Sequence, residues 1–430
     1  MRNYYFIILL LAVVHLSAQE ELTETADIYK TRVLESAEVD FLMSYYNQDG
    51  DNAAVTGGIG TEKLTDLAPT IVVSIPLNED DILILDGQIS AYTSASSSNV
   101  NPFDGNGTPD PFVETSGASA SEVWINGTGT YTHNSDDRNK IWSAKLSLSS
   151  EYDYLSVGFG GSYNRLFNQK NTEVGLSGNI YLDKWNPIYP YELRPFLSNG
   201  NNRSTFNPNY NPDVEAFTKL GRNSYSAGLF LSQILSKKLQ GSVSVDYILQ
   251  KGLLSMPLQR VYFSDTESFM VGNFRLADDI ERLPDSRSKI AVGGRLNYYL
   301  TQFLTVRSFY RYYTDDWGIL SNTASIELPV KIGGSFTVYP SFRYYDQTAA
   351  DYFAPYAEHV STDAYYTSDY DLSKFSSTQF GFGLSYTDIF TKAHLGNFGV
   401  KSIDLKYHRY ERNTAFSANL FSFGVHFVMD

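Results

Sequence analysis

The sequence of 430 residues contains no cysteine, so the chain can form neither a disulfide-stabilised scaffold nor a lipoprotein held through a lipidated cysteine. Basic residues are the minority of the charged ones, because 33 Lys and Arg stand against 48 Asp and Glu, for a formal net charge of -15. This excess of acid argues against nucleic acid as a partner and against adhesion to an anionic surface.

Long apolar runs are missing as well, with one exception at the N-terminus. There, Arg2 precedes an apolar run over 4–16, which ends at the small residues Ser17 and Ala18. The run is shorter than the ~20 residues that a membrane-spanning helix needs, and its layout is typical of a secretory signal peptide. We therefore expect a cleaved signal peptide over 1–18; a retained membrane anchor is the alternative.

Apolar residues with a helical period are also scarce, apart from the stretch ETADIYKTRVLESA, which we interpret within a periplasmic lead-in over 19–36. Period-two alternation takes their place, as in LQGSVSVDYILQ over 239–250, where only Ile248 breaks the pattern. One face of such a strand is apolar and the other is polar. The segments are longer than the five or six residues usual in soluble domains and fit tilted strands that cross a membrane.

About sixteen such segments follow one another along the chain. They cover 37–46, 67–77, 82–93, 122–132, 140–150, 154–164, 172–182, 223–235, 239–250, 288–300, 303–313, 319–328, 334–345, 377–387, 400–409 and 417–428.

The connections between these segments fall into two classes. If the first strand leaves the periplasm, every second connection is short, although the one at 388–399 is longer than the rest. The long connections all lie on the other side, at 94–121, 183–222, 251–287 and 346–376. This asymmetry predicts an all-β transmembrane antiparallel up-and-down β-barrel of about 16 strands (14 to 18) over 37–430, with short periplasmic turns and long extracellular loops. A secreted β-sandwich or propeller is the soluble alternative.

The last segment, SANLFSFGVHFVMD, places Phe421, Phe423, Val425 and Phe427 on one face. It resembles the aromatic-rich terminal strand that outer-membrane barrels present to their assembly machinery, which is therefore an expected partner together with outer-membrane lipid.

More narrowly, YKTRVLESAEVDFLMSYYNQDG, the loop SASSSNV…SGASASEVW and SIDLKYHRYERNT…SFGVHF resemble a family of Gram-negative outer-membrane barrels known as a domain of unknown function. The resemblance covers nearly the whole mature chain and implies a location in the outer membrane. It also implies that neighbouring genes encode a periplasmic flavin-transferring enzyme and a small lipoprotein. No flavin site is evident in the sequence, and no cofactor is expected.

In a barrel of this size the polar faces line a lumen wide enough for water. Ten charged residues are the candidates for lining it: Asp40, Asp86, Lys145, Glu173, Asp246, Arg295, Arg307, Arg311, Glu327 and Arg343.

The four arginines of this set fall on strands ten, eleven and thirteen, close together on the barrel wall. Opposite acids such as Asp40, Asp86 and Asp246, they form a basic strip whose transverse field orients a permeating charged solute. The alternative is a satisfied polar plug in which the arginines pair with Glu327 or with loop carboxylates. Both interpretations stay open from sequence alone.

Enzymatic motifs are missing: neither G-x-S-x-G nor H-E-x-x-H is present, and the histidines are scattered. His359 with Asp351 and Asp363 on one outer loop is a remote catalytic candidate, and an exposed loop histidine is the simpler interpretation. No enzymatic activity is expected.

Tyrosines near the strand ends, such as Tyr298, Tyr310 and Tyr344, suit the aromatic girdles of a barrel, although they could instead stack on sugars. The loop NPFDGNGTPDPF over 101–112 places oxygen ligands at alternate positions, but Pro109 stands where an EF-hand needs glycine. A turn-rich surface segment accounts for this loop better than a calcium site.

Two functional classes remain unranked: a channel for small polar or charged solutes, and a structural or interaction barrel that works with periplasmic or surface partners. An outer-membrane enzyme is a distant third.

Overall fold

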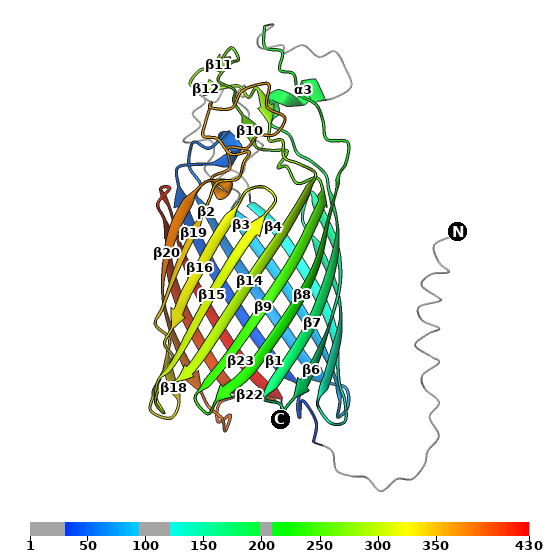
Figure 1. The fold of residues 1–430 in the computed structure, drawn as a ribbon, viewed down its shortest axis with the longest axis vertical. Coiled ribbons are helices and arrows are strands. Elements are labelled where there is room, and N and C mark those ends of the chain that lie inside the picture. The colour runs from blue at the N-terminus through cyan, green and yellow to red at the C-terminus, as the bar shows by residue number, and fades with distance from the viewer. Residues whose placement is uncertain (1–30, 94–120, 198–208, 430) are drawn as a thin grey trace, which may run out of the picture.

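The computed structural model describes residues 31–93, 121–197 and 209–429 (Figure 1). The predicted signal peptide, most of the lead-in and the loop 101–112 lie outside these residues. The described end of the lead-in lies beside two turns: the Val33 amide donates to the Glu79 carbonyl, and the Arg138 guanidinium donates to the Thr31 carbonyl.

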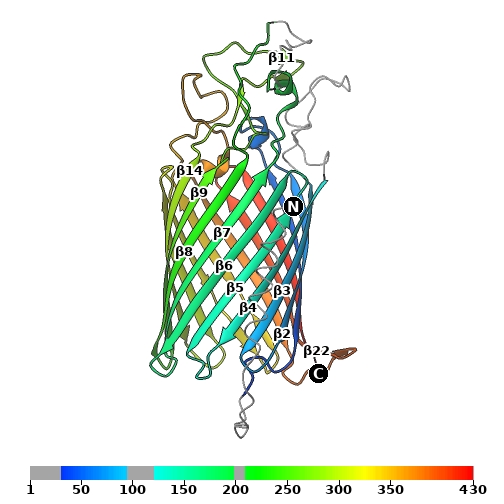
Figure 2. The same cartoon turned by 90° about the vertical axis from the view of Figure 1, so that its right-hand side faces the viewer.

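One large antiparallel sheet of 19 strands forms the body of the molecule, and sixteen of these strands make a closed barrel (Figures 1 and 2). The sixteen are β1 (Glu38–Gly50), β2 (Leu64–Pro76), β3 (Asp81–Thr93), β4 (Ser121–Asn134), β5 (Lys140–Ser150), β6 (Tyr154–Phe167), β7 (Thr172–Trp185), β8 (Gly221–Ser236), β9 (Leu239–Gly252), β14 (Ser286–Tyr299), β15 (Thr305–Asp315), β16 (Leu320–Glu327), β19 (Ser341–Gln347), β20 (Phe375–Thr387), β22 (Phe398–Arg412) and β23 (Phe416–Met429).

Each strand pairs with its neighbours in chain order, and β23 pairs with β1 from Phe416 opposite Gly50 to Val428 opposite Glu38. This last pairing closes the barrel, so the aromatic-rich terminal strand leaves no open edge. The predicted fold class and the predicted number of strands are confirmed.

The alternation of the sequence determines which face of each strand points outward. On β9, Val243 is 50% exposed and Val245 is 40% exposed, and on β8 the neighbouring Leu229 is 54% exposed. Such apolar side chains cover the outer wall, where lipid replaces water. The intervening residues, such as Ser244 and Asp246, therefore point into the lumen.

Two prolines interrupt the twelfth and thirteenth strands of the barrel, counted in chain order. β17 (Val330–Ile332) continues β16 beyond Pro329, and β18 (Phe336–Val338) precedes β19 across Pro340. Because proline has no amide hydrogen to give to the ladder, the pairing is interrupted at both places. The predicted segment 319–328 therefore corresponds to β16 without β17, and the predicted segment 334–345 spans both β18 and β19.

All the long connections lie at one end of the barrel, as predicted, although short ones such as 151–153 and 413–415 lie there too (Figures 1 and 2). The longest turn at the short-loop end contains β21 (His394–Leu395), which forms a small hairpin with β22. At the other end the connection 51–63 between β1 and β2, which was not among the four predicted long loops, also takes part in tertiary structure through η1 (Ala54–Thr56).

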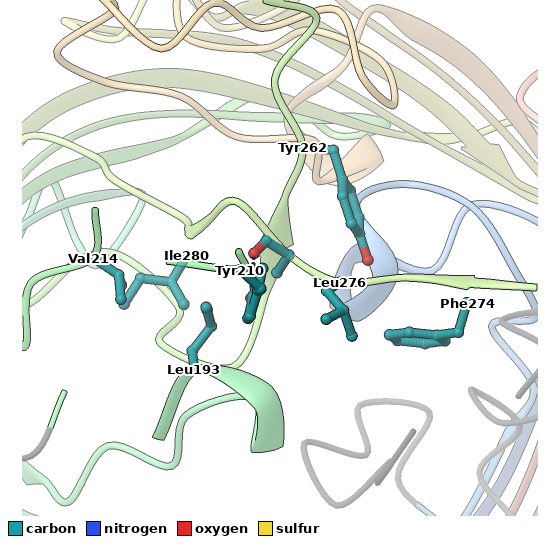
Figure 3. Close-up of a cluster of buried hydrophobic side chains, with 8 residues drawn as sticks. Leu193, Tyr210, Val214, Tyr262, Phe274, Leu276 and Ile280 are labelled. Carbon is teal, nitrogen blue, oxygen red and sulfur yellow. Dashed lines mark hydrogen bonds between the residues drawn. The ribbon is translucent and has the colours of Figure 1, made fainter. Parts of the chain in front are cut away.

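Above the long-loop end, segments of four connections pack into a folded cap, which we define as residues 51–63, 186–197, 209–220, 253–285 and 348–374 (Figure 1). Its core includes Leu193, Tyr210, Tyr262, Phe274 and Ile280 (Figure 3). Besides η1, the cap's regular elements are η3 (Tyr191–Leu193), α3 (Arg194–Leu197), β10 (Arg260–Val261), β11 (Met270–Val271), β12 (Phe274–Arg275), β13 (Asp279–Ile280) and η4 (Tyr370–Leu372). No helix in the described ranges is long and apolar enough to cross a membrane.

Candidate functional site

The ten candidate residues lie on the strand faces opposite the exposed apolar side chains, and the structure joins some of them to partners. Arg307 donates to Glu327 across β15 and β16, with Nη1 at 2.9 Å from Oε1. Asp40 lies 2.5 Å from Nδ1 of His426 across the β1–β23 closure. Lys145 Nζ lies 3.3 Å from the hydroxyl oxygen of Tyr181. Arg307 is therefore paired as the plug interpretation expects, because the carboxylate of Glu327 neutralises it.

The other three arginines are arranged differently. Among the described residues, no carboxylate oxygen lies within 4.0 Å of Arg295, Arg311 or Arg343. The guanidinium of Arg295 instead lies over the ring of Phe309, with Cζ 5.2 Å from the ring centroid. Arginine keeps its charge throughout the ordinary pH range, so these side chains present positive charge to the lumen.

Strand register places the arginines on one stretch of wall. Arg295 on β14 pairs with Phe309 on β15, Phe309 pairs with Ser325 on β16, and Ser325 pairs with Arg343 on β19. Arg311 lies two residues beyond Phe309 on the same face of β15. We call Arg295, Arg311 and Arg343 the arginine wall.

The acids are placed in two ways relative to the arginine wall. Asp86 on β3 lies half of the sixteen-strand circumference away from Arg311, as a transverse field requires. Asp246 lies on β9, directly beside β14, and lines the same recess as Arg295 and Arg311. The expectation that Asp246 faces the arginines from another part of the wall is therefore wrong, because chain order makes β9 the immediate neighbour of β14. Glu173 pairs in register with Ser232 on β8.

The cap joins loops from opposite sides of the barrel mouth. Connection 51–63 enters from strands one and two, and connection 253–285 enters from strands nine and ten, half a circumference away. Arg260 Nη1 nevertheless donates to the Val55 carbonyl at 3.2 Å. Gly57, with φ of +77°, lies so close to Tyr262 that an added Cβ would stand 2.6 Å from the ring. Glycine is needed there for both its conformation and its size, and the two loops meet across the opening.

A buried ion pair stands at this meeting point. The guanidinium of Arg260 is fully buried and donates to both carboxylate oxygens of Glu192, at 2.7 Å and 3.0 Å. The Arg260 side chain also lies over the Phe274 ring, with Cζ 5.2 Å from its centroid. Glu192 comes from a third connection, so one arginine links three loops.

Several carboxyl groups in the cap are shifted toward their protonated forms. Burial, together with the negative charge of Asp369, raises the pKa of Glu281 to about 8. Burial and the neighbouring Asp371 raise the pKa of Asp369 to about 6, and burial raises the pKa of Glu62 to about 7. Glu281 accepts hydrogen bonds from the Thr367 hydroxyl at 2.5 Å and from the Met256 amide at 2.6 Å.

The remote catalytic candidate is not assembled. His359 is 4% exposed, so its interpretation as an exposed loop histidine is wrong. Its Nε2 lies 2.9 Å from the Thr367 carbonyl, and burial lowers its pKa. The carboxylate of Asp363 accepts from the Val360 amide instead. In the described part of the chain, no three His, Asp or Glu side chains gather as a metal site requires.

Sequence reasoning missed two features of this site. Phe309 is an aromatic residue on a polar strand face, and the break in alternation beside Arg307 and Arg311 is a signal that could have identified it. The sequence carries no such signal for the cap, because the cap's contacts join residues from connections that have no periodic pattern.

Residues 8–414 match the model of a family described as "Protein of unknown function (DUF3570)". The comparison with curated proteins found no match.

Among solved structures, the chain is similar to a bacterial polysaccharide outer membrane secretin, with 10% identity, 93% of this chain and 99% of that chain covered, and a TM-score of 0.43. It is similar to a BenF-like porin from Pseudomonas fluorescens Pf-5, with 8% identity, coverage of 92% and 100%, and a TM-score of 0.41. It is also similar to the siderophore receptor PirA from Pseudomonas aeruginosa, with 10% identity, coverage of 89% and 56%, and a TM-score of 0.40.

Proposed function

We propose that this chain, which belongs to the DUF3570 family of proteins of unknown function and folds as an outer-membrane β-barrel, is a channel for small charged solutes. In this proposal the lumen favours anions. Export by the signal peptide over 1–18 and insertion through recognition of β23 by the assembly machinery are parts of this proposal.

The arginine wall is the observation that carries the proposal. The whole chain has a formal charge of -15, yet these three guanidinium groups share one stretch of lumen wall. Charges of one sign on a low-dielectric wall raise the local concentration of counter-ions. Arg307 contributes less to such a field, because Glu327 neutralises it at 2.9 Å.

Small residues beside the arginine wall support passage through this lumen. Gly293, Ser325 and Ser244 occupy lumen-facing positions next to its arginines. Their side chains fill little of the cross-section, so the arginine side chains border a space rather than a packed core.

Single-channel recording in a potassium chloride gradient tests the proposal. The triple substitution Arg295→Gln, Arg311→Gln, Arg343→Gln removes the positive charge of the wall and keeps polar side chains. We expect the reversal potential to shift toward cation preference, because the field that favours chloride is lost.

Arg409→Gln is the matched control for a change of charge. Arg409 pairs with Glu411 and Asn419 on the outer face of its strand, so its loss leaves the lumen field unchanged. Wild-type protein without conductance, or a triple variant with the wild-type reversal potential, would rule the proposal out.

An interaction barrel is the second candidate, and the cap favours it. A surface domain with its own apolar core and a buried ion pair is a rigid platform that a partner can recognise. Because the cap lies at the long-loop end, which is the predicted extracellular side, it suits a surface partner, whereas the periplasmic flavin-transferring enzyme implied by the resemblance would reach only the short turns at the opposite end. Co-purification from the native membrane tests this candidate: a partner retained by the full chain and lost on replacement of 256–281 by a short linker supports it.

A further inference from the structure

The inner face of β8, β9, β14 and β15 holds a recess whose floor is a glycine. Gly293 pairs with Ser244 of β9 on one side and with Arg311 of β15 on the other. Arg295 and Phe309 form the next row of the same face. Because Gly293 has no side chain and Ser244 has a small one, the wall is hollow between larger neighbours.

The floor has little room for a side chain. A Cβ added to Gly293 would stand 3.1 Å from the Ser244 hydroxyl oxygen and 3.5 Å from Cε2 of Phe309. A larger aliphatic side chain would therefore occupy the recess itself. The backbone of Gly293 does not have a positive φ, so substitution there changes the space and not the conformation.

Two guanidinium groups and one carboxylate border the recess. Arg295 and Arg311 come from adjacent strands, and the stacking of Arg295 on Phe309 restricts the plane of its guanidinium. Arginine presents paired N–H donors that match the two oxygens of a carboxylate. On the other side, Asp246 lines the same recess, and its carboxylate can accept hydrogen bonds from a donor group of a ligand.

We propose that this recess is a binding site for small monocarboxylates that also carry an ammonium or hydroxyl group, such as amino or hydroxy acids. The carboxylate binds Arg295 and Arg311, and the donor group faces Asp246. The single negative charge of a hydroxy acid matches the net single positive charge of the three side chains, and in an amino acid the added ammonium charge is matched by Asp246, whereas a dianion would be repelled by Asp246. The inference deepens the proposed channel function, since the site lies on its conduction path.

L-serine binding to the purified full-length protein in detergent micelles, measured by isothermal titration calorimetry, tests the site without requiring conductance. We expect saturable binding that Gly293→Val weakens by about tenfold or more, because the valine side chain fills the floor. Gly294→Val is the matched control: Gly294 is the next residue, its side chain position faces the outer wall, and a Cβ there meets only the Ser242 carbonyl oxygen at 3.7 Å.

Acetate and inorganic phosphate separate the parts of the proposal. Acetate, which lacks the donor group, and phosphate, which carries more negative charge, are expected to bind at least about tenfold more weakly than L-serine. Acetate binding equal to that of L-serine, absent L-serine binding, or equal L-serine binding by Gly293→Val would overturn the assignment.

The channel and the recess can fail separately. Current without L-serine binding would contradict the recess alone, and L-serine binding by a barrel without current would contradict the channel alone. Saturable interruption of the current by L-serine, lost in Gly293→Val and kept in Gly294→Val, is the result that supports both.

Discussion

At the scale of single residues, Arg260 shows how the cap depends on buried charge. Its guanidinium has no access to water and is satisfied by Glu192, by the Val55 carbonyl and by the face of Phe274. Desolvating two ions is unfavourable, so such a pair specifies which loops meet more than it adds stability. Removing only one partner leaves an uncompensated charge inside the cap.

We therefore expect Arg260→Met to destabilise the cap by roughly 3–5 kcal/mol. The double variant Arg260→Met, Glu192→Leu should recover most of this loss, because no charge is then buried without a partner. Protease susceptibility of the cap in the membrane-inserted protein measures both. A double variant as susceptible as the single one would show that the hydrogen bond to Val55, and not the charge, is the important contact.

At the scale of structural elements, the strands and the cap differ in how far sequence predicts them. The segments 140–150 and 154–164 begin where β5 and β6 begin, because alternation is a local signal that one strand carries by itself. The cap's elements are two to four residues long and are held by contacts such as that of Arg260 with Val55, 205 residues apart. Nothing local in either segment indicates such a partner.

The candidate site divides in the same way. Alternation placed Arg295 and Arg311 on the polar face of their strands, and chain order placed them close together. Whether Arg307 pairs with Glu327 or stays unpaired depends on the strand register. An error of one residue in that register moves the side chains of a strand to its other face. The recess around Gly293 depends on register across four strands and was not predicted.

The buried carboxyl groups of the cap predict that the stability of the cap depends on pH. The folded pKa of Glu281 is about 8, above its usual 4.5, because burial favours the neutral acid. The folded state therefore holds a proton that the unfolded cap releases, so this stability is complete below pH 4.5 and is lost as pH rises through about 8. Asp369 and Glu62 act in the same direction, with folded pKa values of about 6 and about 7.

We expect the cap to open more readily at pH 9 than at pH 5, with Glu281 alone raising the opening constant by up to about tenfold per pH unit near neutrality. Hydrogen exchange of cap amides, corrected for the intrinsic effect of pH, measures this. Glu281→Gln should flatten the dependence, because an amide resembles the protonated acid, and exposed Glu358→Gln is the control. A cap that becomes more protected as pH rises would contradict the argument.

At the scale of the whole molecule, the barrel and the cap are two parts with opposite effects on a solute. In the channel that we propose, the arginine wall draws anions into the lumen, whereas loops that meet from opposite sides of the mouth narrow the entrance. The two parts are covalently continuous but energetically distinct, since the barrel is held by backbone ladders and the cap by side-chain packing and buried charge. Conductance and selectivity should therefore respond to different substitutions.

Replacing residues 256–281 by a short flexible linker tests this separation. The deletion removes Arg260, Tyr262 and Phe274, and with them the contacts that join loops across the mouth. We expect single-channel conductance to rise by about twofold or more, because the entrance is no longer narrowed, while the reversal potential stays at the wild-type value. A heat-modifiable gel shift checks that the barrel is intact. If conductance stays the same, the cap does not limit entry; if the reversal potential moves, the cap and not the arginine wall selects the ion.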